Sequence, residues 1–395
     1  LKEMSTWLYT RHGVDMPDMT KESVADMLAT PGLPEPAAAL LRIRQQLGKT
    51  STSKYTALIA ATMDDGRMRG TLQYCGASRT GRWAGRLFQP QNLPVPTFTD
   101  TFALVAAFVC GVAIHLYDDL MAAASSAIRA MICAPPGRKL LVSDLANIEG
   151  RVLAWLAGET WKVEAYAAGK DLYIEAYAKA FHVVYDAVTK AQRRIGKVME
   201  LAFGYQGGKG AVAQFAPDIE EEEAERWKVA WRAAHPKIVR FWYDVEEAVR
   251  EAICTPGTSV RVNEFIVVGC DKKMLRIRLP SGRFLCYFDP KIINGEITYM
   301  GTAYYQWKRI GSYGGKFVEN IAQGVARDIL ASGMLGAEDQ GYEMLCTVHD
   351  ELITETANSR HYTIETLNSI LSTNPPWAEG LPLAATGYAS ERYQK

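Results

Sequence analysis

Apolar and polar residues follow a helical spacing along most of the chain and a strand-like alternation in shorter stretches. Residues 1–50 read as short amphipathic helices with a helix start at Thr20, and helical patterns dominate from Ile148 to about Ile253. The breaks between the first helices fall at Pro17, Pro31, Pro34 and Pro36. Residues 258–300 alternate Val, Ile, Leu and Phe with polar residues around a Pro-Ser-Gly turn, which predicts hairpins.

Three further segments can be assigned from local signals. Gly70–Pro96 is turn-rich and strewn with Arg, Gln and Asn, which favours an extended polar loop. A helix is expected from Thr101 onward, and another from Pro217-Asp218. In the second of these, the acidic run Glu220–Glu223 suits the positive end of the helix dipole.

Two acidic residues stand at the ends of expected strands. Lys139–Val142 is a short apolar run that ends at Ser143-Asp144, which predicts a buried strand. Apolar runs also flank His349-Asp350, although tight two-residue hairpins prefer Asn-Gly or Asp-Gly at their tips. Because local rules tend to break at functional sites, this tip is a candidate site, and an ordinary exposed polar turn is the alternative.

Asp144 is followed directly by the start of a helix. Glu149 and Arg151 are expected in the first turns of that helix, close enough to line the same cleft as Asp144. A strand that ends in a carboxylate beside further polar side chains is a candidate binding site. The alternative is that Asp144 only caps the helix.

A third candidate is a stripe of residues spaced by four. Arg193, Lys197, Leu201 and Tyr205 would form one slowly winding row about 18 Å long on a helix. Two cations followed by an aromatic ring suit the phosphates, then the sugar and base, of a nucleoside triphosphate. A surface helix with ordinary basic residues is the alternative.

The composition narrows the class of protein without deciding it. The 395 residues are 48% apolar, which suits two or three globular domains, and 44 Lys plus Arg balance 44 Asp plus Glu. Any surface for nucleic acid must therefore come from local segregation of charge. The seven dispersed cysteines include no CxxC pair, which argues against a zinc ribbon and a secreted disulfide framework. Phe102–Ile114 is too short to span a bilayer, so no membrane partner is expected.

In this order, the three candidate sites resemble motifs A, B and C of the family A DNA polymerases, which include bacterial DNA polymerase I and many phage enzymes. The similarity covers nearly the whole chain, because Thr80-Gly81-Arg82 with Gln91-Asn92-Leu93-Pro94 looks like the family's primer-binding segment. Leu279–Tyr287 and Asn320–Gln323 look like the hairpin and helix that follow the fingers. The resemblance implies an α+β right-hand fold with an antiparallel palm sheet, helical fingers and a short helical thumb-like segment.

The same resemblance implies a division of the chain and a set of roles. The thumb-like segment would be 1–50, the palm 51–155 and 301–395, and the fingers with the hairpin insertion 156–300. Asp144, Asp350 and the backbone carbonyl of Leu145 would hold two Mg²⁺ ions, with Mn²⁺ as a substitute, and Lys197 would be a catalytic proton donor. The residues implied to bind the deoxynucleoside triphosphate (dNTP) are Arg193, Lys197, Leu201, Tyr205, Glu149 and Tyr173. Those implied to contact primer and template are Arg82, Gln91, Asn92, Gln323 and His349, with Glu351, Arg151 and Asn320 as accessory residues.

The implied function is template-directed addition of dNTPs to a primer 3′-hydroxyl, with release of pyrophosphate, in phage or bacterial replication or repair. The implied partners are primer–template DNA, dNTPs, and an upstream exonuclease domain or a processivity partner. The cytoplasm of a bacterium or of a phage-infected host is expected; an organelle stays open because the sequence begins at Leu1 rather than Met.

Two alternatives remain beside this function. A single-subunit RNA polymerase relative is opposed by Glu149, where a small residue would be needed, and by the length of the chain. A catalytically inactive DNA-binding relic is opposed by intact Asp144, Asp350 and Lys197. Leu201 departs from the bacterial pattern, which has Phe or Tyr there, and Tyr173 stands where His is usual.

Overall fold

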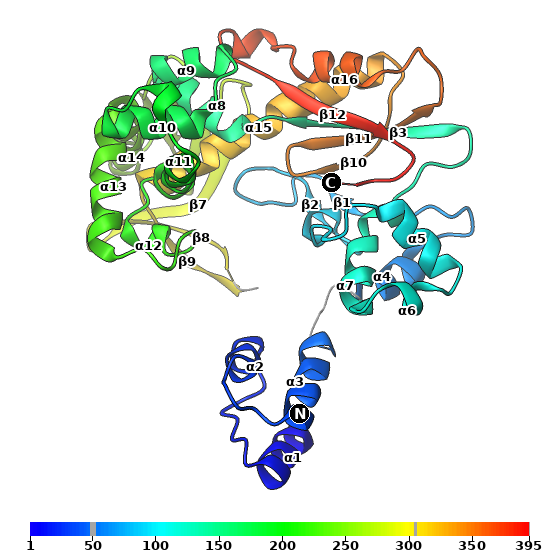
Figure 1. Ribbon diagram of the computed structural model, residues 1–395. Helices are drawn as coiled ribbons and strands as arrows, with labels where there is room; N and C mark the ends of the chain where they lie inside the picture. The colour runs from blue at the N-terminus through cyan, green and yellow to red at the C-terminus, as the bar shows by residue number, and fades with distance from the viewer. Residues whose placement is uncertain (48–52, 304–305, 395) are drawn as a thin grey trace. The chain divides into compact units, whose positions relative to one another are not determined.

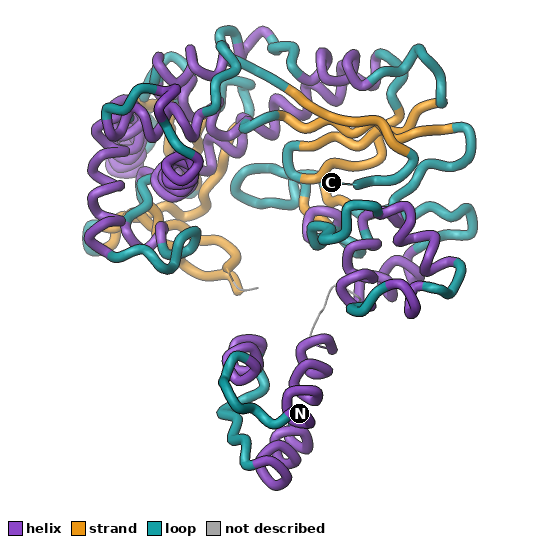
Figure 2. The backbone as a smooth tube through the Cα atoms, in the orientation of Figure 1, coloured by secondary structure: helices purple, strands orange, loops and turns teal. Residues whose placement is uncertain are grey.

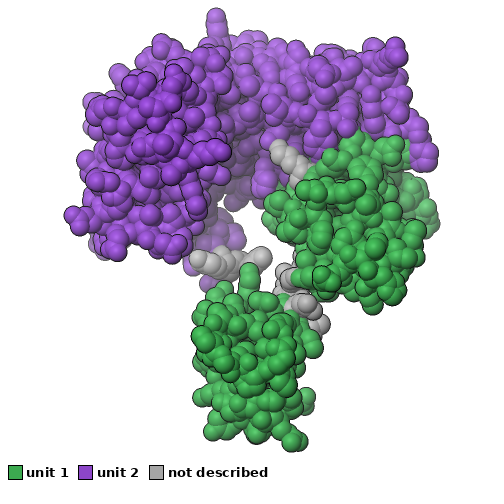
Figure 3. Space-filling model, viewed as in Figure 1, with its two compact units in different colours: residues 1–71, 85–135, 390–395 green, residues 72–84, 136–389 purple. Residues whose placement is uncertain are grey.

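The computed structural model describes residues 1–47, 53–303 and 306–394. These residues form two units, of which unit 1 comprises 1–71, 85–135 and 390–395, and unit 2 comprises 72–84 and 136–389 (Figure 3). Residues 48–50 of the predicted thumb-like segment lie outside the described residues. The four-part division of the chain remains a prediction.

Unit 1 is helical. Its helices are α1 (Lys2–His12), α2 (Lys21–Leu28), α3 (Glu35–Leu47), α4 (Ser53–Ala61), η2 (Pro90–Asn92), α5 (Thr101–Val109), α6 (Ala113–Leu116), α7 (Leu120–Ala127) and η3 (Arg129–Met131). The predicted helix from Thr101 is confirmed, and Thr20 caps α2 by accepting a hydrogen bond from the Ser23 amide at 3.3 Å. Pro36 does not break a helix as predicted, because it stands in the first turn of α3, where no amide hydrogen is needed.

The centre of unit 2 is a four-stranded sheet in the order β10-β11-β3-β12. Its strands are β3 (Arg138–Leu145), β10 (Glu343–Val348), β11 (Glu351–Ala357) and β12 (Ala385–Ser390). The predicted strand before Asp144 is confirmed as β3, in which Leu140, Leu141 and Val142 are fully buried. Helix α15 (Gly314–Asp339) packs on β10 and β11, and α16 (Ile364–Leu371) packs on β3 (Figure 1).

Helices fill the sequence between β3 and the hairpins, as predicted (Figure 2). They are α8 (Ile148–Ala157), α9 (Thr160–Ala167), α10 (Leu172–Phe181), η4 (Tyr185–Ala187), α11 (Lys190–Phe203), α12 (Lys209–Val212), α13 (Glu221–Ala234) and α14 (Pro236–Cys254), with η5 (Pro376–Ala378) near the C-terminus. The predicted start of a helix at Pro217-Asp218 is wrong, since Glu220 is the N-cap of α13 and the acidic residues after it fill the first turn.

The predicted hairpins form a six-stranded antiparallel sheet in sequence order. Its strands are β4 (Ser259–Arg261), β5 (Val267–Cys270), β6 (Met274–Arg278), β7 (Phe284–Ile293), β8 (Glu296–Ala303) and β9 (Gln306–Ser312). Helix α14 packs on this sheet because Ile238, Phe241, Trp242, Val245 and Val249 recur at helical spacing and are all buried. Gly70–Pro96, expected as a loop, also contains the short strands β1 (Leu72–Gln73) and β2 (Ala84–Gly85).

None of the helices formed by the described residues has both the length and the apolar character that crossing a bilayer requires.

Candidate active site

The two predicted metal-binding aspartates come together where the two central strands of the four-stranded sheet, β3 and β11, meet end to start. Strand β11 pairs with β3 so that Glu351 lies opposite Asp144, and the Leu145 amide donates to the carbonyl oxygen of Asp350 at 3.2 Å. Residues that oppose one another in such a pair have Cα atoms about 5 Å apart. The backbone therefore places Asp350, in the turn directly before β11, one residue from the position opposite Asp144 on β3.

The turn between β10 and β11 has the unusual backbone that its sequence predicted. His349 adopts a φ of 55°, a left-handed conformation that side chains other than Gly rarely take. Asp350 follows it and keeps only 18% of its side chain exposed. The burial raises the pKa of Asp350, and the carboxylates of Glu149 and Asp144 raise it further, while Arg82 opposes them.

A cation from another part of unit 2 reaches these carboxylates. Arg82 Nη2 lies 2.8 Å from Asp350 Oδ1 and 2.7 Å from Glu149 Oε1. The acidic side chains thus already accept a positive group between them, as carboxylates that hold a divalent ion would. Among the described residues no cluster of three or more His, Cys, Asp or Glu has the arrangement of a metal site.

Glu149 and Tyr205 meet as predicted. The Tyr205 hydroxyl donates to Glu149 Oε2 at 3.1 Å, and burial raises the pKa of Tyr205 well above its usual value, so the phenol keeps its proton. Tyr205 lies beyond the end of α11, which stops at Phe203, and not on the helix as the four-residue spacing predicted. Its segment rests on the start of α15, where the Gly315 amide donates to Gln206 Oε1 at 2.8 Å. A Cβ at Gly315 would lie 2.4 Å from the Tyr205 carbonyl oxygen, so only Gly fits there.

The other three members of the predicted stripe lie along α11. Lys197 and Leu201 are exposed, and Arg193 is held at the start of the helix by Asp171, with 2.6 Å between Nε and Oδ2. The ring of Tyr173 lies 5.2 Å from the Arg193 guanidinium carbon. The structure therefore gathers Arg193 and Tyr173 as the resemblance implied. It adds Asp171, which was not named from the sequence although the resemblance indicated Tyr173, two residues further on.

A buried charged cluster holds the rear of α11 and was also missed. Glu200 Oε2 pairs with Lys162, whose side chain is 1% exposed, and Glu200 Oε1 accepts from Trp231 Nε1 at 2.9 Å. His235 Nε2 lies 3.1 Å from the same oxygen, and burial lowers the pKa of His235. Lys162 and Trp231 are 38 and 31 residues from Glu200, so no local pattern marks the cluster.

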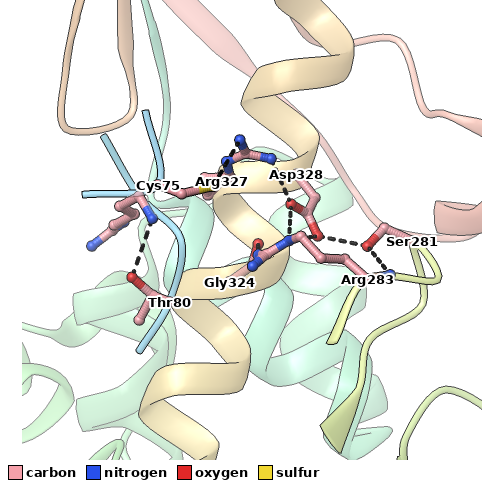
Figure 4. A network of polar contacts seen from close by, with 8 residues as sticks. Cys75, Thr80, Ser281, Arg283, Gly324, Arg327 and Asp328 are labelled. Atoms are coloured by element: carbon pink, nitrogen blue, oxygen red, sulfur yellow. Dashed lines mark hydrogen bonds and ion pairs between the residues drawn. The ribbon is translucent and has the colours of Figure 1, made fainter. Parts of the chain in front are cut away.

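The turn that carries Thr80 lies beside a second polar network, which includes Arg283, Gly324 and Asp328 (Figure 4). Arg283 Nε donates to Asp328 Oδ1 at 2.8 Å, and its Nη2 donates to the Gly324 carbonyl at 2.9 Å. A Cβ at Gly81, whose φ is 76°, would lie 2.6 Å from Arg283 Nη1. The Thr80-Gly81-Arg82 turn therefore packs directly on the fixed guanidinium of Arg283, which positions Arg82.

Gln323 and Asn320 lie on α15 and line a hollow of about 400 Å³ with Arg79 and Lys316. Asn320 Nδ2 donates to the Tyr287 hydroxyl at 3.0 Å. Gln91 belongs, like Asn92, to unit 1, where both form part of η2.

Two residues named from motifs A and C are buried. Glu351 is only 2% exposed, beside exposed His349. Arg151 is 7% exposed and donates from Nε to the Ala146 carbonyl at 2.7 Å and from Nη1 to the Pro382 carbonyl at 2.8 Å. The prediction that Arg151 lines the cleft is wrong, because side chains two positions apart on a helix, such as Glu149 and Arg151, do not share a face.

Comparison with known proteins places this geometry in context. Residues 2–271 match the family model described as DNA polymerase family A. The chain is similar to the DNA polymerase of Bacillus phage SP02, with 37% identity over 408 residues that cover 100% of this chain and 62% of that protein.

A solved structure shares the fold. It is the "POL domain of Pol1 from M. smegmatis complex with DNA primer-template and dNTP", with a TM-score of 0.66 and 18% identity over 98% of this chain and 60% of that one. The predicted α+β polymerase fold is thereby confirmed. The chain spans about three fifths of the length of the proteins it matches.

Proposed function

The chain belongs to DNA polymerase family A, and from this premise we propose that it adds dNTPs to the 3′-hydroxyl of a primer paired to a template. The primer oxygen would attack the α-phosphorus, the bond to the bridging oxygen would break, and pyrophosphate would leave. The observation that carries the proposal is the pairing of β3 with β11, which brings Asp144 and Asp350 together beside Glu149 and Arg82.

Asp144 and Asp350, with the Leu145 carbonyl, are the groups proposed to hold two Mg²⁺ ions. When bound, such ions lower the pKa of the attacking hydroxyl and neutralise charge on the phosphates. The pKa of Asp350, raised first by burial and further by the carboxylates of Glu149 and Asp144, supports the assignment, because a cation beside these groups would favour their ionised forms. Arg82 would leave Asp350 when the cation binds and would turn to the primer end.

The exposed side of α11 is proposed to receive the triphosphate. Arg193, which Asp171 orients, and Lys197 would bind the phosphates, and Lys197 would give a proton to the leaving pyrophosphate. Leu201 would lie against the sugar and base. Tyr205, hydrogen-bonded to Glu149, would fill the space of a ribose 2′-hydroxyl, which favours a DNA over an RNA polymerase.

The DNA contacts are proposed on the same basis. Gln323, Asn320 and His349 would contact the primer terminus or the nascent pair, and Gln91 and Asn92 the primer side of the duplex. The related mycobacterial structure is described with primer–template and dNTP, which are the partners proposed here. We place the activity in phage or bacterial replication or repair, in the bacterial cytoplasm; an exonuclease domain or processivity partner remains a prediction.

Primer extension tests this function. The purified chain should extend a labelled primer on a template with dNTPs and Mg²⁺ and should stop when EDTA is added. Asp350→Asn should lower the rate at least about a thousandfold, because the loss of charge removes a ligand that supports transition-state stabilisation. Glu343→Gln, which neutralises an exposed carboxylate on β10, is the matched control and should keep the wild-type rate. If the wild-type chain binds primer–template DNA but does not extend the primer, the alternative of a catalytically inactive DNA-binding relic is correct.

A further inference from the structure

The six-stranded sheet has one covered face and one open face. Alternate residues of its strands point into the main core, where α14 packs; these are Val268, Leu275, Ile277, Leu285 and Tyr287. The positions between them face the other way and are exposed; these are Arg276, Arg278, Phe284, Cys286 and Phe288. The helices with the main contacts to the sheet, α14 and α15, share the buried core, and the exposed positions form a second face presented to solvent.

The open face is hollowed into a groove of about 510 Å³ over β4 to β7. Its floor is made of small residues, because Val267 and Gly269 occupy the outward positions of β5. Val267 pairs with Arg261 on one side and with Arg278 on the other. Adjacent strands lie about 4.8 Å apart, so the two arginines flank the floor at a separation of roughly 10 Å.

The charge of the groove is positive. Arg276 is neutralised by Asp271 at 2.6 Å, whereas Arg261 and Arg278 make no ion pair within the part of the chain that the structure describes. Arginines without acidic partners on a solvent-facing surface suit a polyanion, since they bind phosphate in a planar, bidentate manner. The surrounding loop adds exposed Lys272 and Lys273.

Exposed aromatic rings continue the face across the sheet. Phe284 pairs with Arg278 in the register of β6 and β7 and is 49% exposed. Further along, Phe288 and Trp307 are 42% and 60% exposed, with ring centroids 6.0 Å apart. Cations interleaved with exposed rings on a sheet are the arrangement by which proteins bind single-stranded nucleic acid, because unpaired bases stack on the rings.

We propose that the open face of the β4–β9 sheet binds single-stranded DNA, the unpaired template ahead of the primer terminus. The identity of the strand rests on the proposed function; the affinity for an unpaired strand does not. A duplex hides its bases from the rings, so the rings favour the single strand. Strand β9 leads directly into α15, the helix that carries Gln323, so the face and the proposed primer-binding residues belong to one continuous segment.

Fluorescence anisotropy with a labelled single-stranded oligonucleotide in EDTA tests the inference without catalysis. The variant Arg261→Gln/Arg278→Gln should bind more weakly. Its plot of log K against log salt should be shallower by about 1.4, since each lost phosphate contact contributes about 0.7 for single strands. The control Lys237→Gln/Arg360→Gln removes the same charge from exposed positions elsewhere in unit 2 and should keep the wild-type slope.

A second variant separates stacking from charge. Phe284→Ala should weaken binding at least about fivefold with an unchanged salt slope, because a ring and not a cation is lost. If both variants bind like the control, or if the wild-type chain does not bind the oligonucleotide, the inference is wrong and a protein partner becomes the better occupant of the face.

Primer extension on a one-nucleotide template overhang distinguishes this inference from the proposed function. The arginine variant should extend that substrate at the wild-type rate, because the reacting groups are intact. Failure of the wild-type chain to extend any primer would refute the proposed function, while an altered oligonucleotide affinity in the variant would still support binding at the sheet.

Discussion

Replacement of Arg82 by alanine should tighten metal binding in the absence of DNA. In the structure, Arg82 Nη2 lies 2.8 Å from Asp350 and 2.7 Å from Glu149, and the three side chains are 21%, 18% and 29% exposed respectively. A metal ion that binds Asp350 must displace this guanidinium. Hydrogen bonds that involve charged groups contribute about 1.5 to 3 kcal/mol each.

The expected gain in metal-binding free energy is smaller than the sum of both contacts. When Arg82 is displaced, its guanidinium forms hydrogen bonds with water that replace part of the lost interaction. In the Arg82→Ala variant the metal ion no longer has to break one such contact. Because about 1.4 kcal/mol corresponds to a tenfold change in Kd, the Kd for Mn²⁺ should be about tenfold lower than in the wild type. Mn²⁺ binding to the DNA-free protein can be measured by electron paramagnetic resonance, which does not depend on primer extension.

Arg79→Ala is the matched control, because it removes an exposed arginine from the same loop and should leave the Kd unchanged. The Mn²⁺ affinity of the wild-type protein should also decrease as the pH is lowered. Because the pKa of Asp350 is raised, this carboxylate takes up its proton closer to neutral pH than an ordinary aspartate does. Equal or weaker Mn²⁺ binding by Arg82→Ala would refute the view that Arg82 occupies the place of the cation.

Substitutions at three further positions have expected outcomes. Glu149→Ala should raise ribonucleotide incorporation at least about tenfold by opening the space beside Tyr205, and an unchanged ratio of ribonucleotide to dNTP incorporation would refute the steric role. Glu200→Gln should lower the free energy of unfolding by about 3 kcal/mol, measured by urea denaturation, because it leaves buried Lys162 without its counter-charge. Burial alone would raise the pKa of Glu200, but Lys162 and His235 hold it below its usual value. The contribution of Glu200 to stability is therefore full above about pH 4.3 and is lost as the pH falls further. Thermal melting of the wild type and of Glu200→Gln over this pH range would show the loss. Arg283→Met should reduce kcat about tenfold, because the guanidinium on which the Gly81 turn packs is lost, while the Mn²⁺ affinity should stay within twofold. If Arg283→Lys restored kcat, the positive charge and not the shape of the guanidinium would be what matters.

The sequence predicted those parts of the site that local chemistry determines. Asp144 follows an apolar strand, and Asp350 stands at a tip without a turn-forming residue, so each could be assigned from its immediate neighbours. Once two such strands pair, the meeting of the two acids follows from the register.

Contacts between distant segments could not be predicted in this way. The bond of Arg82 to Asp350 joins residues 268 positions apart, and the bond of Lys162 to Glu200 joins residues 38 positions apart on α9 and α11. Four-residue spacing placed Tyr205 on a helix that ends before it, since periodicity does not report where the backbone leaves the helix. Arg151 was assigned to the cleft because it lies close to Glu149 in the sequence, but closeness in sequence does not determine the direction in which a side chain points.

The glycine at the start of α15 has a mechanical consequence. Gly315 lies against the Tyr205 carbonyl and donates a hydrogen bond to the Gln206 side chain. The segment that follows α11 is therefore anchored to α15, the longest helix among the described residues. If α11 rotates about this anchored end, Arg193 lies farthest from the pivot, about 15 Å along the helix from Phe203. A small rotation there would move Arg193, proposed to bind phosphate, through the largest arc and would leave Tyr205, proposed to lie beside the sugar, almost in place.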